Sequence, residues 1–294
     1  MRHEARPVQA TFSDGRTGEV QIQFPVREKN RVYIVGTAST KDIIPWNDPD
    51  AEYWGVNNLY GVTLTNATGT CHYDRWFEIH NLWLDPATNK FLRRGDAEFR
   101  GQPVLDYLKG IANLGCTVYM QKHWPDLIPM SVQYPLAEVV AFFQEKGIDL
   151  RYCRYLTNTI TYEIVLAIYL GFTDIQVWGV DMQAGSEYGW QRPSCEFWLG
   201  VAAGMGIKIH IPEEADLLKC RFIYGFEEKQ QDDFRRKLEK IRKDMKIKRI
   251  QAQQQVAENE RHMQQLLGAE NVVTEIQNIW TNLGDDLLLT KRGS

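Results

Sequence analysis

The chain has 294 residues, of which 44% are apolar and 12% aromatic, enough to build one large core with an appendage. Its formal net charge of −4 argues against general binding of nucleic acid or of an anionic membrane surface. No apolar stretch approaches the roughly eighteen residues of a membrane-spanning helix, and the start of the chain lacks an apolar signal segment. We therefore expect a cytoplasmic protein without a membrane partner.

Residues 1–30 are polar with weak apolar alternation around Ile22, which predicts an arm or a hairpin. From Arg31 to about Lys219, strand-like apolar runs alternate with helix-like segments. This alternation predicts an α/β domain over residues 31–224, with a Rossmann-like, mostly parallel sheet and helices on both faces. The expected strands are 32–35, 53–57, 73–78, 116–120, 174–179 and 206–211, and the expected helices are 102–113, 135–145, 159–170 and 194–204.

Residues 225–294 differ in composition and predict a helical extension. Residues 226–267 contain no Gly or Pro, and apolar residues follow the 4-3-4 spacing of a coiled-coil seam at Phe234, Leu238, Ile241 and Met245. Gly268 is expected to end this helix, and residues 271–289 to form a second one. Two interpretations stay open: a solvated helix lying on its own domain, or an oligomerising coiled coil through 226–267, which the seam favours.

The turn after the first strand is the first candidate site. Gly36, Thr37 and Ser39 end a buried strand with a Gly and small hydroxyls, and Asn57 and Asn58 end the next. In an open α/β sheet this carboxyl edge binds ligands, often phosphates, so these five residues are candidate nucleotide contacts.

Two later segments would share that edge. Asn158 and Thr159 precede an apolar helix, and they either cap it or also contact an anion at its N-terminus. Asp181 follows a strand and could bind a ribose, act as a base, or be an ordinary turn residue. The loop after it carries Tyr188, Gln191 and Arg192, which are candidates for contacting the phosphate or the substrate.

Residues 73–80 supply the candidate base. Alternation along a strand puts Glu78 and His80 on one face, where they could form a carboxylate–imidazole pair, and Arg75 on the other. Glu78, His80 and Asp181 are the expected catalytic residues, and Arg75 is a further candidate for contact with substrate or phosphate. The five cysteines (Cys71, Cys116, Cys153, Cys195, Cys220) lack zinc-ligand spacing, and we expect no metal site or required cofactor, although a divalent ion stays open.

Over about residues 31–219 the chain resembles bacterial sialyltransferases that use a CMP-sugar, and the related motility-accessory and pterin-pyrophosphokinase-like group. The features that carry this resemblance are the first strand ending in Gly and hydroxyls, the Asn that follows the second strand, and the late strand ending in Gly-Val-Asp. The resemblance implies that Gly36–Ser39, Asn57 and Asn58 hold the nucleotide, and that a late His, by position His210, is the base. The turn here reads Gly-Thr-Ala-Ser-Thr where that family has Gly-x-Gly-Pro-Ser. The layout RWFEIH, GVDM and QRPSCEFWLG also resembles uncharacterised tailed-phage proteins.

Together these features predict a nucleotide-binding transferase, a glycosyltransferase with a nucleotide-sugar donor, CMP-linked in the resembled family. The alternative is a phage virion or morphogenesis protein that uses the α/β domain as a scaffold, its helical tail for assembly, and a phage or host protein as partner.

Overall fold

The computed structural model describes residues 3–61, 73–148, 154–182, 187–220, 223–226 and 229–290, without the side chains of residues 3, 187–188, 229–233 and 281–290. Two compact units divide the chain, Met1–Lys240 and Ile241–Ser294. Within the described ranges, no helix is long and apolar enough to cross a membrane.

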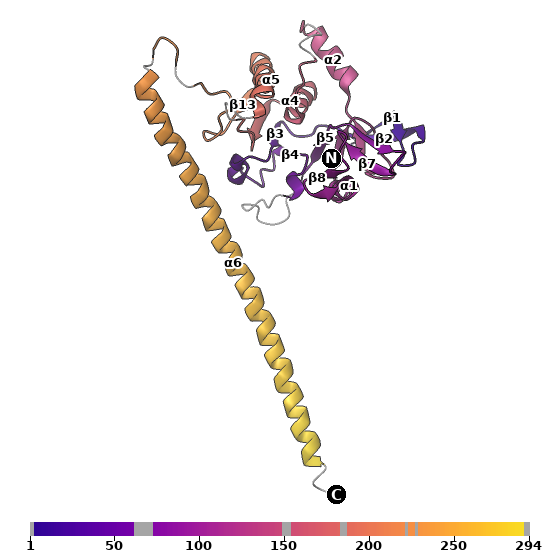
Figure 1. The fold of residues 1–294 in the computed structure, drawn as a ribbon, viewed down its shortest axis with the longest axis vertical. Helices are drawn as coiled ribbons and strands as arrows, with labels where there is room; N and C mark the ends of the chain where they lie inside the picture. Colours follow the sequence, from indigo (N-terminus) through magenta and orange to yellow (C-terminus); the bar gives the residue numbers. More distant parts are fainter. Residues whose placement is uncertain are drawn as a thin grey trace. The chain divides into compact units, whose positions relative to one another are not determined.

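A seven-stranded parallel sheet forms the centre of the first unit (Figure 1). Its strand order is β11-β10-β5-β4-β3-β12-β13, and every neighbouring pair runs parallel. The strands are β3 (Arg31–Val35), β4 (Ala51–Val56), β5 (Arg75–Glu78), β10 (Thr117–Met120), β11 (Ser131–Gln133), β12 (Asp174–Trp178) and β13 (Lys208–His210). All six expected strands are present, and the expected α/β class is confirmed. At three residues, β11 is too short to be recognised as an apolar run.

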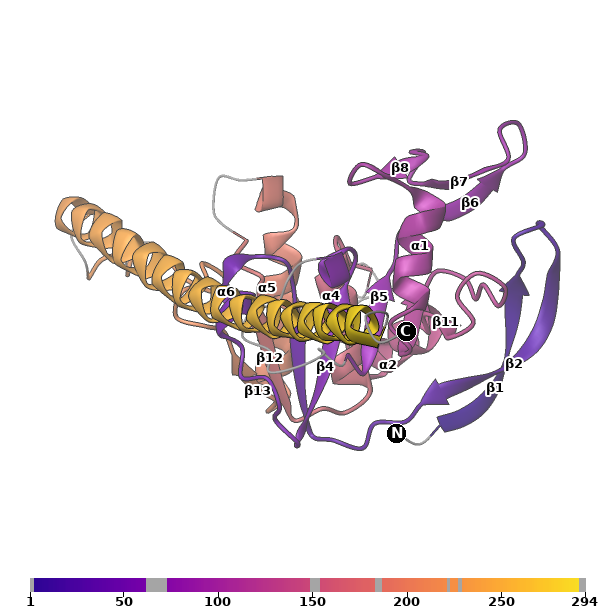
Figure 2. The same ribbon diagram turned by 90° about the horizontal axis from the view of Figure 1, so that it is seen from below.

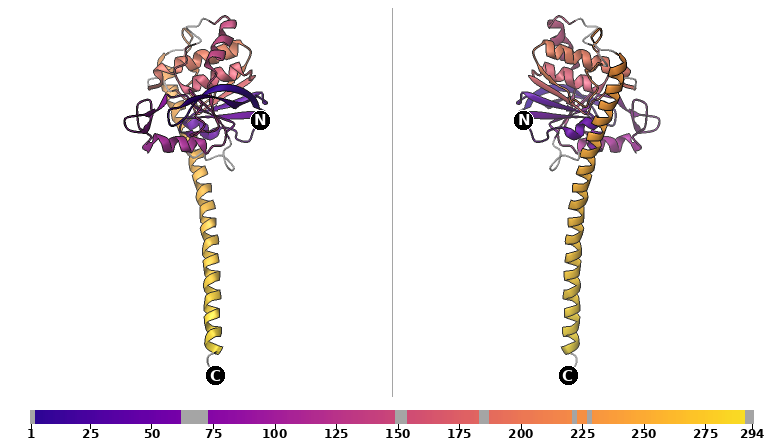
Figure 3. Two further views of the ribbon diagram at one scale, coloured as in Figure 1. Left: turned by 90° about the vertical axis from the view of Figure 1, so that its right-hand side faces the viewer. Right: turned by 90° about the vertical axis from the view of Figure 1, so that its left-hand side faces the viewer.

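Helices cover both faces of this sheet, because successive side chains of each strand point to opposite sides. On one face Ile34, Trp54 and Phe77 pack with α2 (Leu136–Glu145), α4 (Thr159–Tyr169) and α5 (Arg192–Gly204). On the other face Tyr33 and Trp76 pack with α1 (Val104–Ala112). Figure 3 shows the sheet between α1 and the pink and salmon helices, and Figure 2 shows the same elements from below. All four helices expected in this domain are confirmed.

The path of the chain through the sheet reverses once. From β3 it proceeds to β4, β5, β10 and β11 on one side, and then returns to form β12 against the other side of β3, followed by β13. The carboxyl ends of β3 and β12 therefore flank the topological switch point, the place where open α/β sheets bind ligands.

The first unit also contains smaller elements outside the central sheet. At the N-terminus, β1 (His3–Thr11) and β2 (Thr17–Pro25) pair antiparallel, so of the two predicted forms the hairpin is observed. The pairs β6 (Leu82–Asp85) with β7 (Lys90–Arg93) and β8 (Glu98–Phe99) with β9 (Gln102–Pro103) precede α1. The 3-10 helices are η1 (Ser39–Ile43), η2 (Leu59–Gly61) and η3 (Glu187–Trp190).

The C-terminal extension is a single helix, α6 (Lys229–Thr290). The prediction that Gly268 ends a first helix is therefore wrong. A Gly inside a helix is less favourable than Ala by only about 1 kcal/mol, and good helix formers on both sides supply continuous backbone hydrogen bonds. No atom lies near the position of an added Cβ at Gly268, so no tertiary contact requires a Gly there.

Candidate functional site

Three polar side chains meet at the switch point: Ser39 and Thr40 after β3, and Asp181 after β12. Thr40 Oγ1 donates to Asp181 Oδ1 at 2.7 Å, and Ser39 Oγ lies 3.5 Å from Oδ2. The same Thr40 hydroxyl accepts the N–H of Gly179 at 2.8 Å. Burial raises the pKa of Asp181, and the two hydroxyl hydrogen bonds offset part of the rise. We call Ser39, Thr40 and Asp181 the switch-point cluster.

Gly36 allows the two loops to approach each other closely. The N–H of Ala38 donates to the carbonyl of Gly179 at 2.8 Å, and a Cβ at Gly36 would lie 2.3 Å from that carbonyl oxygen. Gly179 has φ +65°, and a Cβ there would lie 2.4 Å from the Gly36 oxygen. The two glycines are therefore needed for backbone packing, which explains Gly36 without a phosphate. Thr37 is exposed beside this contact.

Asn57 and Asn58 follow β4, the next strand along. Asn57 has φ 51°, and its N–H donates to the carbonyl of Phe77 at 3.0 Å. Its side-chain Oδ1 is buried and has no hydrogen-bond partner within the described residues. The carbonyl of Asn58 accepts from the N–H of Gly61. Since adjacent strands lie about 4.8 Å apart, Asn57 is one strand away from the switch-point cluster.

A second polar group lies at the end of β5. The imidazole Nδ1 of His80 is 2.5 Å from Glu78 Oε1, so the predicted carboxylate–imidazole pair is observed. Two residues that sequence reasoning missed complete it: Arg93 Nε lies 3.2 Å from Glu78 Oε1, and the Tyr107 hydroxyl donates to Oε2. Periodicity on α1 could have placed Tyr107 on the buried face, whereas no local pattern marks Arg93. We call these four residues the Glu78 cluster.

The electrostatics of the Glu78 cluster favour an ionised carboxylate. Glu78 is fully buried, and burial alone would raise its pKa. The hydrogen bond from His80, the charge that His80 carries when it is protonated, the charge of Arg93 and the Tyr107 hydroxyl outweigh that effect and lower the pKa. Arg93 also lies 3.9 Å above the Phe99 ring. His80 keeps 22% of its side chain exposed, so it is the member of the pair that can be reached from outside.

Arg75 lies in the core and not at the edge with the other candidates. Its guanidinium is fully buried, with Nε 2.8 Å from Glu52 Oε2 and Nη1 2.9 Å from the Tyr119 hydroxyl. It therefore ties β5 to β4 and β10. An Arg with this arrangement has no surface on which to contact a substrate.

The hydroxyl-rich start of α4 meets the start of α5. Asn158 Oδ1 accepts the N–H of Thr161 at 3.0 Å, which is an N-cap. The Thr157 and Thr161 hydroxyls lie 2.5 and 3.0 Å from the Ser194 hydroxyl of α5. These contacts account for the hydroxyls beyond what a cap needs. Thr159 is buried in the first turn.

The loop before α5 is anchored through backbone groups. Gln191 accepts from Asn158 Nδ2 at its carbonyl, 3.2 Å away. Arg192 pairs with Glu196 at 2.7 Å and donates to the carbonyls of Lys219 and Met182, the residue after Asp181. Tyr188 has its backbone in η3, and its side chain lies outside the described part, as do residues 183–186 of the same loop.

His210, implied as a base by the resemblance, lies on the edge strand β13. It is exposed, and its ring centroid is 5.1 Å from that of Trp178. Because β13 is two strands from β3 on the side away from β5, His210 and His80 lie at opposite sides of the switch point.

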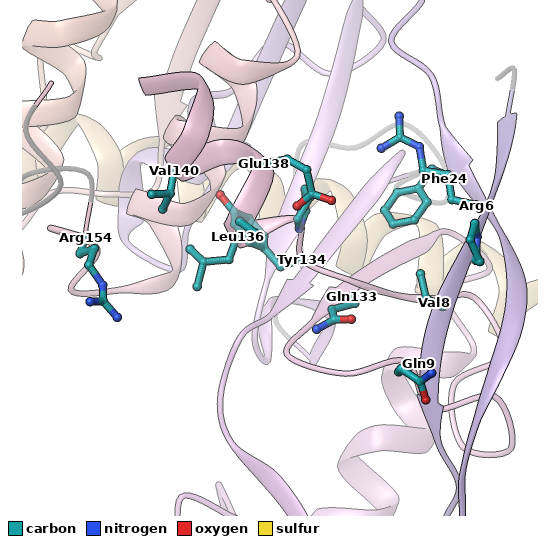
Figure 4. A pocket seen from close by; sticks show the side chains of 13 residues that line it. Arg6, Val8, Gln9, Phe24, Gln133, Tyr134, Leu136, Glu138, Val140 and Arg154 are labelled. Atoms are coloured by element: carbon teal, nitrogen blue, oxygen red, sulfur yellow. The ribbon is translucent and has the colours of Figure 1, made fainter. Parts of the chain in front are cut away.

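A cavity of about 650 Å³ lies elsewhere, at the opposite edge of the sheet from β13. Figure 4 shows Tyr134, Leu136 and Glu138 on one side of it, and Phe24 and Arg6 of the N-terminal hairpin on the other. Tyr134 follows β11, four strands from β3, or roughly 19 Å at 4.8 Å per strand. The cavity and the switch-point cluster are therefore separate features.

The described residues contain no group of three or more His, Cys, Asp and Glu that could hold a metal ion. Cys116, Cys195 and the exposed Cys220 are free thiols, while Cys71 and Cys153 lie outside the described ranges. Burial raises the pKa of Cys195 to about 11.

Comparisons with known proteins give similarity to solved structures alone. A scan against protein-family models and a search of curated proteins found no match. The chain is similar to the sialyltransferase CstII from Campylobacter jejuni in complex with cytidine-5'-monophosphate, with 14% identity, 62% of this chain and 79% of that chain covered, and a TM-score of 0.37.

Two further structures are similar at the same level. The α-2,3-sialyltransferase Cst-I from the same organism has 10% identity, coverage of 64% and 78%, and a TM-score of 0.38. CST-II in complex with a trisaccharide acceptor and CMP has 13% identity, coverage of 68% and 93%, and a TM-score of 0.38. Similarity this low transfers no activity to the chain. The resemblance to tailed-phage proteins stays a prediction.

Proposed function

We propose that this protein is a nucleotide-binding transferase, and specifically a glycosyltransferase that uses a nucleotide-sugar donor. The observation that carries the proposal is the position of the switch-point cluster. Asp181, Ser39 and Thr40 gather at the carboxyl ends of β3 and β12, where an open parallel sheet binds its ligand. A carboxylate there suits a ribose hydroxyl, and Asn57, whose side-chain oxygen has no hydrogen-bond partner among the described residues, would supply a further polar contact one strand away.

The distance between the two polar groups supports a sugar nucleotide over a free nucleotide. The Glu78 cluster lies on β5, two strands from β3, or about 10 Å at 4.8 Å per strand. A donor bound at the switch point would extend its phosphate and sugar along the edge toward His80. Arg192 donates to the carbonyl of Met182, the residue after Asp181, and in the proposed complex it would exchange its ion pair with Glu196 for the phosphate.

In the proposed reaction His80 is the general base. In the reactive tautomer Nδ1 of His80 donates its proton in a hydrogen bond to Glu78, and Nε2 takes the proton of an acceptor hydroxyl. This tautomer requires Arg93 Nη2, which lies 2.6 Å from Nδ1, to direct its N–H to Glu78 Oε2 instead. The acceptor oxygen forms a bond to the anomeric carbon while the bond from that carbon to the nucleotide phosphate breaks. The phosphate leaves with the electron pair, and Arg192 stabilises its charge. Arg93 and Tyr107 hold Glu78 in place.

Thermal shift with CMP, UDP, GDP and their sugar conjugates tests the binding step. A ligand at a hundred times its Kd stabilises the folded state by about 2.7 kcal/mol, which corresponds to a rise in Tm of roughly 5–10 °C. The rise should be lost in Asp181→Asn and kept in Asp106→Asn, an exposed acid on α1. If no nucleotide raises Tm at millimolar concentration, the proposal is wrong, and a scaffold role for the domain becomes the better interpretation.

The catalytic step needs its own variant. His80→Gln should keep the nucleotide-induced rise in Tm but lower sugar transfer by about 10²–10⁴-fold, the usual contribution of a general base. Transfer is measured as nucleotide release in the presence of an acceptor. If His80→Gln transfers at the wild-type rate and His210→Gln does not, the base lies at the other side of the switch point.

A further inference from the structure

Because α6 continues through Gly268, the seven-residue repeat of the coiled-coil seam keeps one register on both sides of that glycine. The positions at alternating spacings of three and four continue from Ile241 and Met245 through a polar centre to Leu266, Ala269, Val273, Ile276 and Trp280. The large apolar residues among them are exposed in the single chain, including Ile276 at 49% and Trp280 at 73%. The predicted break at Gly268 assigns most of this second apolar block to a separate helix over 271–289, with no shared register. In the seven-residue repeat, Gly268 lies away from the seam.

We propose that two copies of the protein associate through residues 241–280 of α6 as an antiparallel two-stranded coiled coil. In the coiled-coil convention Ile241 is a d position and Met245 an a position. When one helix is reversed, each a position faces a d position of the partner. Every seam position from 241 to 280 satisfies this rule, because each a position lies as far from the midpoint between residues 260 and 261 as a d position on the other side of it.

Three of the six resulting layers join apolar residues to apolar ones, and the other three contain Lys248, Gln255, or Asn259 with His262. The layers pair position 241 with 280, 245 with 276, 248 with 273, 252 with 269, 255 with 266 and 259 with 262. The outer layers thus join Ile to Trp and Met to Ile. Lys248, which would face its own copy in a parallel pair, instead lays its aliphatic stem on a Val and extends its ammonium to solvent. Asn259 faces a His, so that the amide and imidazole can hydrogen-bond at the centre.

The positions flanking the seam agree with the same arrangement. In an antiparallel pair each e position flanks an e position of the partner. Arg249 then faces Glu270, and Val256 faces Met263, which accounts for two exposed apolar residues outside the seam. Each contact occurs twice by symmetry. In a parallel pair the flanking partners would include Lys237 with Arg242, which repel each other.

The distribution of charge along α6 also favours the antiparallel orientation of the two helices. Residues 229–250 include ten basic and four acidic side chains, whereas residues 251–290 include one basic and six acidic ones. A parallel pair would place the two basic halves side by side, while an antiparallel pair places each basic half against an acidic one. Charge complementarity and the layer pairing therefore select a second copy in reverse orientation as the occupant of the seam.

Cysteine cross-linking of the full chain tests the orientation. Ala252→Cys and Ala269→Cys are made separately, in chains distinguishable by size, and oxidised alone and mixed; the unsubstituted chain, with its exposed Cys220, sets the background. We expect the mixture to give a cross-linked dimer of mixed size and neither variant alone to exceed background. Self-linked dimers of each variant would show a parallel pair instead. If neither the mixture nor the single variants cross-link, the proposal is overturned.

Two matched variants test association itself by light scattering. Ile276→Asp places a charge in two symmetry-related layers and should convert the dimer to a chain of 34.1 kDa at micromolar concentration. Leu267→Asp, of similar exposure but outside the seam, should remain dimeric. Circular dichroism reports whether α6 stays helical in each. A wild-type chain that is monomeric at 100 µM, or equal behaviour of the two variants, would contradict the proposal.

Discussion

Glu163 in α4 is a carboxyl group enclosed in the core of the first unit. It has no exposed surface, and neither of its oxygens has a hydrogen-bond partner within the described residues. Burial raises its pKa well above the ordinary value, because the apolar surroundings favour the neutral form of the carboxyl group. In the unfolded chain it ionises at about pH 4.3, so folding must bind a proton at higher pH.

This difference predicts a pH-dependent gain of stability on removing the carboxyl. The wild type loses stability as pH rises from about 4.3 toward the raised folded pKa, because only the unfolded state is then ionised. Glu163→Leu should therefore raise the free energy of unfolding by about 1–3 kcal/mol at pH 7.5, and by less at pH 4.5. Urea unfolding at the two pH values measures it. A gain that is equal at both, or larger at pH 4.5, would show that Glu163 is not buried as a neutral acid.

The close approach of Gly36 to the Gly179 carbonyl predicts that a larger side chain at position 36 destabilises the protein. A Cβ there would meet the Gly179 carbonyl, so Gly36→Ala should lower the free energy of unfolding by at least about 1–3 kcal/mol. The matched control is Gly200→Ala in α5, where no atom lies within 4 Å of the added Cβ. That substitution should stabilise the protein by about 0.5–1 kcal/mol, since Ala is the better helix former. Thermal unfolding of both variants compares them, and a Gly36→Ala variant as stable as wild type would refute the close approach.

At the scale of elements, the buried pair of Arg75 and Glu52 joins β5 to β4. Arg75→Met leaves the Glu52 carboxylate buried without its cation and should destabilise the protein by about 3–5 kcal/mol. Adding Glu52→Leu should recover much of this loss, because no buried charge is then left. Arg16→Met, which breaks the exposed pair with Asp14, should change stability by less than about 1 kcal/mol. If Arg75→Met unfolds like wild type but loses substrate binding, Arg75 contacts the substrate after all.

The expected strands and helices of the domain are found because their signals are local. Residues 32–35 form a continuous apolar run, as a parallel strand covered on both faces requires, and Asn158 caps α4 as its residue type predicts. The prediction that a helix ends at Gly268 fails because the end of a helix depends on the residues that follow the glycine as well as on the glycine itself. Elements of two or three residues, such as β8 and β11, have too few side chains to show a period.

At the scale of the whole molecule, the two units have different sources of stability. The first has its own core on both faces of the sheet, while the second is a single helix with exposed apolar residues. A helix of this kind is stabilised mostly by packing its apolar face against another element. Its exposed apolar stripe is the feature of the second unit that a partner would bury.

A chain truncated after Lys240 should therefore fold and be monomeric. We expect it to keep the cooperative thermal transition of the first unit and the same nucleotide-induced rise in Tm as the full chain, because every candidate contact lies before residue 240. Calorimetry and light scattering on the two forms provide the comparison. A truncated chain that unfolds without a cooperative transition would show that the first unit depends on the helix. Loss of the nucleotide effect alone would place part of the site in the second unit.

The sequence alone determines the α/β class, the strands and helices that build it, and the polar residues at the carboxyl ends of strands. It also pairs Glu78 with His80, since alternation along a strand relates residues two apart. Only the tertiary structure decides that β12 returns beside β3, which makes Asp181 a neighbour of Ser39 and Thr40. It likewise brings Arg93 and Tyr107 to Glu78 and places Arg75 in the core. These contacts join residues far apart in the chain, and strand order, which no local pattern encodes, determines them.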